Sequence, residues 1–311
     1  MGAFLRNSIL SLCLLGNLQA AYCQRNYFAR YTSVGVGIGS SVYYGDLALP
    51  KYLPTSTTNS LRWHAKAEII RHFNSRVSGS LSFSWIRLGA DDFEAKDIAS
   101  FARNLHFRND VKELSLKGLY NLLKDGSTYK KRLKVVPYLS GGISYFFHNP
   151  KAKTPQSLGS QWIELAPLHT EGQGLLNYHK PYKLTGINIP LGLGINYKIR
   201  EAYDISIEAS YRVSFTDYLD DVSGVFINPQ LLTDNLAKVL SNRAFEEIAA
   251  RTGMNRKVKL DAMLSKEPDP FSAISNITGT GVIRGTDKGN DNFWTFSVKI
   301  QYHIPDKIRC P

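Results

Sequence analysis

The chain has 311 residues, with 38 basic and 26 acidic side chains, a formal net charge of +12 and a charged content of only 21%. Aromatic residues make up 12%, a share that suits surfaces meeting both hydrocarbon and water. Beyond the N-terminal segment there is no run of eighteen apolar residues, which excludes a transmembrane helix in the mature chain.

Residues 1–23 have the pattern of an export signal. Arg6 supplies the positive start, "SILSLCLLG" is a short apolar core, and Ala21 and Cys23 occupy the small-residue positions before a cleavage site. The ending "AAYC" also permits lipoprotein processing, which the bulky Tyr22 disfavours. After cleavage Cys310 is the only cysteine left, so neither an internal disulfide framework nor a cysteine-based metal site is expected.

Strand-like alternation of apolar and polar residues runs through the rest of the chain. In the last such segment, "NFWTFSVKIQYHIP", Trp294, Phe296 and Val298 share one face, while Lys299 lies on the other. The pattern predicts eight strands, over residues 33–44, 61–70, 77–85, 111–122, 133–147, 187–198, 203–216 and 292–305.

The length and the polar faces of these segments indicate a membrane barrel. They are about twice as long as the five or six residues common in soluble strands, and membrane strands need about nine to eleven. Gly35 and Gly192 share their faces with charged residues, as in a crowded lumen. The apolar faces are then expected to meet lipid, with aromatic girdles near the strand ends. A soluble sandwich or lipocalin-type barrel would instead turn the apolar face inward.

An open sheet would leave unpaired backbone groups in lipid. We therefore predict an all-β fold, a closed antiparallel eight-stranded transmembrane β-barrel with long extracellular loops. Eight strands enclose an interior just wide enough for side chains. The inward charged residues are expected to form a lattice of ion pairs that blocks diffusion: Arg62, Lys66, Glu68, Glu113, Lys117, Glu208, Arg212 and Lys299.

Connections of alternating length support the same fold. Short ones are expected near residues 74–75, 124–132 and 200–202, and long ones over 45–59, 89–104, 149–181 and 219–291. Outer-membrane barrels have short periplasmic turns and long outer loops. The barrel is thus predicted over 24–304, with 219–291 as an extracellular insertion and 305–311 as a tail, both termini being periplasmic.

The longest loop contains a predicted helix over residues 233–253. Thr233 and Asp234 give an N-cap signal and Gly253 a stop signal. The apolar residues with helical spacing are Leu236, Val239, Leu240 and Ile248. A helix lying on the barrel rim is favoured over one that docks a partner.

Four polar motifs occur where strands reach the outer rim: "YYGDL" (43–47), "RNLHFRND" (103–110), "LHTEGQG" (168–174) and "FTDYLDDVSG" (215–224). We expect structural or contact roles for their members Tyr44, Gly45, Asp46, Arg103, Asn104, Thr170, Glu171, Gly172, Asp217, Tyr218, Asp220 and Asp221. Convergence of Asp46 with the last three aspartates would suit calcium. However, the spacing matches no EF-hand, and turn formation by Asp is favoured, so no metal or cofactor is predicted.

A rim enzyme is the second function class. Its candidate bases are His106, His148, His169 and His179, but the chain has neither G-x-S-x-G nor H-E-x-x-H, and a catalytic base needs a nucleophile within reach. No enzyme activity is therefore predicted. The basic segment "KDGSTYKKRLK" suits lipid phosphates or an acidic partner, and no nucleic-acid partner is expected.

Six segments together resemble the PorG-like outer-membrane barrels of the type IX secretion system of Bacteroidota. They are "GIGSSVYYGDLA", "RNLHFRNDVKELSL", "PYLSGGISYFFHNP", "LHTEGQG", "IPLGLGINY" and "SFTDYLDDVSG", spanning most of residues 31–224. Residues 225–290 carry no matching motif. The resemblance implies a non-enzymatic outer-membrane component of a machine that exports proteins bearing a C-terminal signal, associated with a periplasmic ring lipoprotein and its partner.

Three function classes follow from this reading. The first is a barrel that anchors or organises the secretion complex, in contact with outer-membrane lipid and lipopolysaccharide. The second is a rim enzyme acting on lipid or glycan, and the third a surface adhesin or receptor using loop 219–291. A periplasmic tail would also leave Cys310 free to form a disulfide with a ring component.

Overall fold

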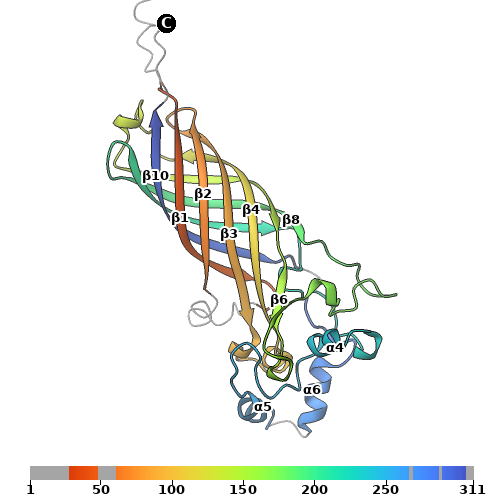
Figure 1. Ribbon diagram of the computed structural model, residues 1–311. Coiled ribbons are helices and arrows are strands. Elements are labelled where there is room, and N and C mark those ends of the chain that lie inside the picture. The colour runs from red at the N-terminus through yellow and green to blue at the C-terminus, as the bar shows by residue number, and fades with distance from the viewer. Residues whose placement is uncertain (1–27, 48–60, 266–268, 287–288, 306–311) are drawn as a thin grey trace, which may run out of the picture.

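The computed structural model describes residues 28–47, 61–265, 269–286 and 289–305. The predicted signal peptide and Cys310 lie outside these residues. Eight long antiparallel strands pair in chain order and close into a barrel (Figure 1), which confirms the predicted fold class. They are β1 (Tyr31–Tyr44), β2 (Arg62–His72), β3 (Val77–Asp91), β4 (His106–Asn121), β5 (Val135–Phe147), β8 (Thr185–Lys198), β9 (Tyr203–Ser214) and β10 (Asn292–Pro305).

The barrel closes between its first and last strands. β1 pairs with β10 along its whole length, from Tyr31 opposite Pro305 to Tyr44 opposite Asn292. No strand edge is left in the wall, as hydrocarbon requires. Both ends of the described barrel therefore lie at one mouth, which we call the terminal mouth. The opposite mouth is the cap mouth.

The wall is apolar outside and polar inside. Val36, Ile38 and Ile207 are 65%, 73% and 60% exposed on the outer face, whereas the charged Glu113 and Lys299 are 0% and 1% exposed. This is the reverse of a water-soluble barrel and suits a hydrocarbon surrounding. Exposed aromatic residues occur near both mouths, at Trp63, Trp85 and Trp294 on one side and Tyr120, Tyr197 and Tyr302 on the other.

The β3–β4 hairpin is longer than predicted. Its pairing continues to Asp91 opposite His106, beyond the expected ends at residues 85 and 111. Two short strands, β6 (Pro150–Lys153) and β7 (Trp162–Glu164), extend the sheet beyond β4. Alternation alone misses this extension because the outer residues at the end of the hairpin are charged rather than apolar.

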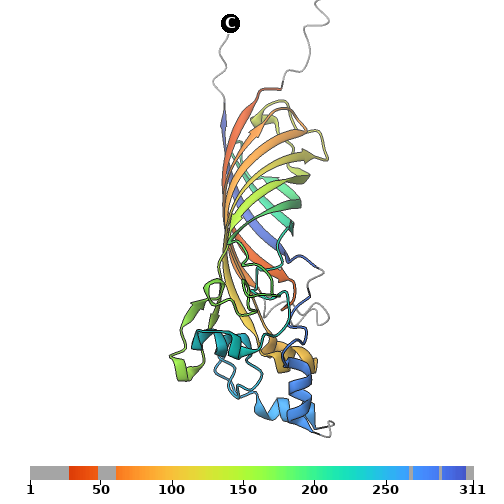
Figure 2. The ribbon, with the colours of Figure 1, turned by 90° about the vertical axis from the view of Figure 1, so that its right-hand side faces the viewer.

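The long loops gather into a cap on one mouth, opposite the C-terminal end of β10 (Figures 1 and 2). The cap comprises the described parts of 45–61, 92–105, 148–184 and 215–291. Its helices are α3 (Ile98–Arg103), α4 (Asn235–Ser241), α5 (Lys257–Leu264) and α6 (Pro270–Thr278), with 3-10 turns at Asp92–Glu94, Gln156–Leu158, Ala166–Leu168 and Pro229–Leu231. A further 3-10 turn, Tyr129–Lys131, lies in the terminal-mouth connection between β4 and β5. No helix in the described part of the chain is long and apolar enough to span a membrane.

The predicted helix over 233–253 is too long. Asp234 caps α4 as expected, accepting a hydrogen bond from Leu236 N at 2.8 Å, but the helix ends at Ser241. Ile248 lies in an isolated β-bridge with Asn255, and Gly253 belongs to a turn with φ of 73°. The backbone leaves the helix at Asn242, which is extended with φ of −141° and donates from its side chain to the carbonyl of Thr278 at 2.7 Å.

The cap has a small hydrophobic core of its own. Buried Ala95, Phe101, Ala244, Leu260 and Leu264 form it, bringing α3 and α5 together. α6 joins the core through Ile274. The cap is therefore a folded layer rather than a set of separate loops.

Candidate functional site

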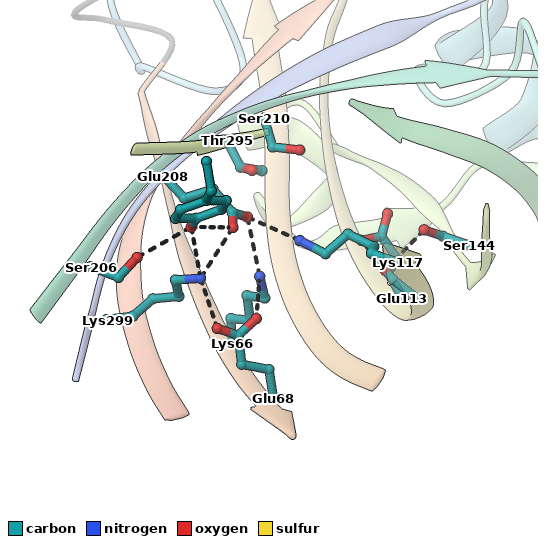
Figure 3. A network of polar contacts seen from close by, with 12 residues as sticks. Lys66, Glu68, Glu113, Lys117, Ser144, Ser206, Glu208, Ser210, Thr295 and Lys299 are labelled. Carbon is teal, nitrogen blue, oxygen red and sulfur yellow. Dashed lines mark hydrogen bonds and ion pairs between the residues drawn. The ribbon is translucent and has the colours of Figure 1, made fainter. Parts of the chain in front are cut away.

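Glu208 on β9 is the centre of a buried ion-pair group that fills the middle of the bore. Its Oε1 lies 3.1 Å from both Lys66 Nζ on β2 and Lys117 Nζ on β4, and its Oε2 lies 3.1 Å from Lys299 Nζ on β10. Tyr138 OH on β5 donates to the same Oε2 at 2.8 Å. Figure 3 shows Lys66, Lys117 and Lys299 converging on Glu208 from different strands of the barrel.

Glu68 is the second carboxylate of this group, which we call the lumen plug. It lies 2.8 Å from Lys66 Nζ and 2.7 Å from Lys299 Nζ. All five charged side chains are at most 3% exposed. Three lysines against two glutamates give the plug a net charge of +1. The bore is therefore occupied by paired charges rather than by an open channel.

A second buried group lies nearer the cap mouth. Glu113 Oε1 is 3.3 Å from Arg212 Nη2, and Glu113 Oε2 accepts from Asn188 Nδ2 at 2.8 Å. Ser115 Oγ also donates to Glu113, at 2.9 Å. Seven of the eight residues predicted to line the lumen thus lie in these two groups.

Arg62 stands apart from both groups. It is the first residue of β2, its Nη1 donates to the carbonyl of Leu61 at 2.9 Å, and its side chain lies beside Gly89. Four residues separate it from Lys66, about 13 Å along a strand. Arg62 pairs with Ser41 on β1, and its position at the cap mouth keeps it away from the plug.

Buried polar atoms without partners line the wall between the ion pairs. The hydroxyls of Ser80, Ser82 and Ser84 and both ring nitrogens of His64 make no hydrogen bond within the described chain. Such positions suit ordered water, which commonly satisfies buried polar groups.

The terminal mouth is closed by a chain of polar side chains that the sequence did not reveal. Ser33 Oγ lies 2.8 Å from His72 Nε2 and 2.6 Å from His303 Nδ1. His303 Nε2 lies 2.9 Å from Asp204 Oδ2, whose other oxygen accepts from Arg132 at 2.6 Å. The chain crosses the seam between β1 and β10, so it ties the barrel closed where its two terminal strands meet.

Ser33, His303 and Asp204 are the residue types of a hydrolase triad, but their surroundings indicate a structural role. Ser33 is 0% exposed, and the adjoining cavity has a volume of about 10 Å³, room for about one water molecule. A nucleophile must reach its substrate, and Ser33 cannot.

At the cap mouth, Tyr43, Asp220 and Asp291 form a buried triad of oxygens. Tyr43 OH lies 2.7 Å from Asp220 Oδ2 and also contacts Asp291 Oδ1. Burial raises the pKa of Asp220 well above its ordinary range, and the nearby Asp291 carboxyl raises it further. The Tyr43 hydroxyl has one proton and can donate it to only one carboxylate. Its close contact with the other carboxylate therefore requires that Asp220 or Asp291 is protonated.

This triad ties loops that are distant in sequence. Asp220 also accepts from Leu47 N at 3.3 Å and Val222 N at 2.9 Å, while Asp291 accepts from Leu219 N at 2.8 Å. A Cβ on Gly45 would lie 1.9 Å from Asp291 Oδ1, so only glycine fits there. The sequence did not predict a site role for Tyr43 or Asp291. Tyr43 lies at a lumen-facing position of its strand, and this position was the available signal.

Arg103 connects α3 to two other loops. Its Nε and Nη2 both donate to the Asp92 carboxylate at 2.8 Å. Its Nη1 donates to the carbonyl of Arg284 at 2.7 Å, and its Nη2 to that of Asp46 at 2.9 Å. Asp46 in turn accepts from Thr286 Oγ1 at 2.6 Å.

Glu171 and Asp221 complete the junction on the other side of the mouth. Glu171 Oε1 accepts from Arg284 Nη1 at 2.9 Å and Ser223 N at 3.1 Å. Asp221 accepts from Thr170 Oγ1 and Tyr182 OH, both at 2.5 Å. Together with the Tyr43 triad and the Arg103 contacts, these bonds form what we call the rim junction.

The other predicted rim residues lie around the junction. Tyr44 is 42% exposed on the outer wall. Asn104 has a φ of 58° and donates to the carbonyl of Arg243 at 2.9 Å. Gly172 has a φ of 74° and Tyr218 stacks on Tyr182 at 4.5 Å, while Asp217 lies in the same turn. Across the described residues, no group of three or more His, Cys, Asp or Glu is arranged to hold a metal ion.

The four rim histidines do not form a catalytic arrangement. His106 Nε2 accepts from Lys153 N at 2.9 Å, and His148 Nε2 lies 3.1 Å from the carbonyl of Lys183; both are buried. His169 occupies a left-handed turn position and His179 is exposed. The buried pair therefore serves loop structure.

The burial of the Asp221 carboxyl predicts a pH dependence of cap stability. Burial raises the pKa of Asp221 to about 6, above the value of about 3.9 in an unfolded chain. The folded cap therefore holds this proton more tightly, so its stability is greatest below pH 4 and falls as the pH rises through 6. The expected loss is about 3 kcal/mol.

Asp221→Asn should flatten this slope without straining the backbone, because asparagine tolerates the residue's φ of 69°. The measurement is amide-exchange protection of residues 170–182 and 217–224 between pH 4.5 and 7, corrected for intrinsic exchange rates. Cap protection that increases over this range would contradict the assignment.

Comparison with known proteins adds a family match and a set of structural likenesses. A family described as "Domain of unknown function (DUF6089)" matches residues 13–157. No curated protein matches the chain. Among solved structures, Ail of Yersinia pestis, crystallised with a heparin analogue, has a TM-score of 0.37 at 9% identity, over 89% of this chain and 99% of its own.

Two further barrels are similar to the same degree. Neisserial surface protein A has a TM-score of 0.39 at 8% identity, over 87% of this chain and 96% of its own. OprG of Pseudomonas aeruginosa has a TM-score of 0.38 at 8% identity, over 90% and 98%. Likeness at this level carries no information about ligands or partners.

Proposed function

We propose that the protein is a non-enzymatic outer-membrane scaffold of the type IX protein secretion machinery, with its cap at the cell surface. The observation that carries the proposal is the rim junction. The motifs that carry the resemblance to PorG-like barrels, at residues 43–47, 103–110, 168–174 and 215–224, all contribute to it. These motifs therefore maintain one rigid cap rather than a reaction centre.

The outer wall supports placement in the outer membrane. An apolar belt with aromatic residues at both mouths is the surface that a lipid-embedded barrel needs. With the cap outside, both termini and the short connections lie in the periplasm. The connection over residues 122–134 contains Lys130 and Lys131, a basic surface that would suit the periplasmic ring lipoprotein or its partner.

The lumen plug supports a scaffolding role over a conduit. Exported polypeptides cannot pass a bore filled by five paired charged side chains. The barrel would thus organise other components while cargo crosses elsewhere. Its stability in the membrane and the rigidity of its cap would be the properties under selection.

Deletion of the gene is expected to stop export of many unrelated proteins that carry the C-terminal signal. These proteins should accumulate in the periplasm, as measured by mass spectrometry of the periplasmic and culture fractions. Complementation with the intact gene serves as the control. Unchanged export in the deletion strain would refute the secretion role, whatever the membrane placement.

A surface receptor is the second candidate, favoured by a groove in the cap. An open cavity of about 770 Å³ is lined by Leu176, Val225, Leu231 and Ile283, among others. Leu176 is 88% exposed and Ile283 69%, which is unusual for a surface without a partner. Leu176→Asp should abolish ligand binding by a receptor while leaving the export of C-terminal-signal proteins intact.

A further inference from the structure

Two unpaired cations lie on the outer wall near the cap mouth, Arg108 and Lys112 of β4. Both point outward, as does Trp85 of β3, which pairs directly with Lys112. Lys112 Nζ is 6.0 Å from the Trp85 ring centre, and the Arg108 guanidinium is 4.3 Å from that of Trp162. Neither cation forms an ion pair with another described residue, and Arg108 Nε has no hydrogen-bond partner among them.

The neighbouring charges cancel one another. Asp110 lies between the two cations on the same face, but Arg87 of β3 binds both of its oxygens, at 2.6 and 3.0 Å. Lys151, opposite Arg108 on β6, is paired with Glu164 at 3.0 Å. Two positive charges therefore remain on this part of the wall.

The surroundings of these cations identify what they face. Lys112 pairs with Phe147 on β5, and Trp63, Trp85 and Phe147 are all substantially exposed. This part of the aromatic girdle continues directly into the apolar belt below it, at Phe83 and Leu114. Cations at such a boundary are placed at the depth of lipid headgroups.

We propose that Arg108 and Lys112, flanked by Trp85 and Trp162, form a binding site for the phosphate groups of an outer-leaflet glycolipid. Arginine and lysine bind phosphate through charge-assisted hydrogen bonds, while the indole rings suit the boundary between sugar headgroup and acyl chain. The inference rests on the proposed placement of the cap at the cell surface. It adds a specific lipid contact on one side of the barrel.

The test uses the folded full-length mature protein in a neutral detergent with purified lipid A, which carries two phosphates, as the probe. Native mass spectrometry and tryptophan fluorescence report binding. The double variant Arg108→Gln with Lys112→Gln is expected to weaken binding at least about tenfold. The intact protein should bind lipid A without its two phosphates more weakly than intact lipid A, by a factor similar to that for the double variant.

Lys134→Gln is the matched control. Lys134 is also an exposed lysine beside an outer aromatic ring, 5.8 Å from Tyr197, but it lies at the terminal mouth. This variant should bind lipid A like the intact protein. Equal binding by the double variant, or equal loss in the control, would overturn the site. Heat-modifiable migration of each variant verifies a folded barrel, and unchanged export in a deletion strain would refute the secretion role separately.

Discussion

Glu208→Ala is expected to destabilise the barrel by about 3–5 kcal/mol, because it removes one partner of buried ion pairs and leaves the others uncompensated. Lys117 would lose the carboxylate at 3.1 Å, and Lys66 and Lys299 would compete for Glu68. The net charge of the lumen plug would rise from +1 to +2. Urea unfolding in lipid vesicles, followed by tryptophan fluorescence, measures the effect.

The same variant is expected to admit ions. Loss of the central carboxylate leaves space and excess positive charge in the bore, so planar-bilayer recordings should show small, anion-preferring currents that the intact barrel lacks. Lys117→Met is the control. In this variant Glu208 keeps its contacts with Lys66, Lys299 and Tyr138, and the net charge of the lumen plug falls to zero. A loss of stability from Lys117→Met equal to that from Glu208→Ala would show that the plug is not organised around Glu208.

Arg103→Ala is expected to release the cap, at a cost of about 3–5 kcal/mol to its local stability. Asp92 is 0% exposed, and burial raises its pKa while Arg103 opposes the increase. Without the guanidinium, Asp92 loses both hydrogen bonds from Arg103, and the carbonyls of Asp46 and Arg284 lose their donor. Hydrogen exchange should increase across 92–105 and 284–286, while the barrel strands stay protected.

Two variants test the specificity of this effect. Arg103→Lys retains the charge but not the forked geometry that bonds both Asp92 oxygens, so it should fall between the intact protein and Arg103→Ala. Lys257→Ala removes a cap lysine that pairs with Glu247 where both side chains are exposed, 56% and 61%; its exchange should stay close to that of the intact protein. Equal exchange in Arg103→Ala and Lys257→Ala would contradict a central role for Arg103.

The barrel could be predicted from sequence because each strand records its surroundings residue by residue. In β10, the alternation of Trp294 with Thr295 and of Val298 with Lys299 fixes both the strand and the direction of its faces. Lys66, Glu68 and Glu208 occupy the polar positions of their alternating strands, and this pattern predicted that all three face the lumen. Their actual pairing was not predictable, since it depends on height along the bore, which separates Arg62 from Lys66.

The cap followed the sequence less closely because its contacts join distant segments. Asp92 and Asp291 gave no local signal, and their importance arises only when folding brings them to Arg103 and Tyr43. The helix predicted over 233–253 ends early, at Ser241, where the next residue, Asn242, is extended and bonds the distant Thr278. α6 was missed although Pro270 at its first position and Ile274 and Ile277 in its body are helix signals.

The position of Lys299 on the final strand couples assembly of the lumen plug to completion of the chain. A polypeptide that lacks its last strand would keep two open edges, and Glu68 and Glu208 would lose one of the two lysines that they share. Partial insertion would then bring unpaired backbone into lipid together with carboxylates that have lost part of their ion pairing. Truncated products thus gain little by entering the membrane, so the wall and the plug select for the complete chain at the same step.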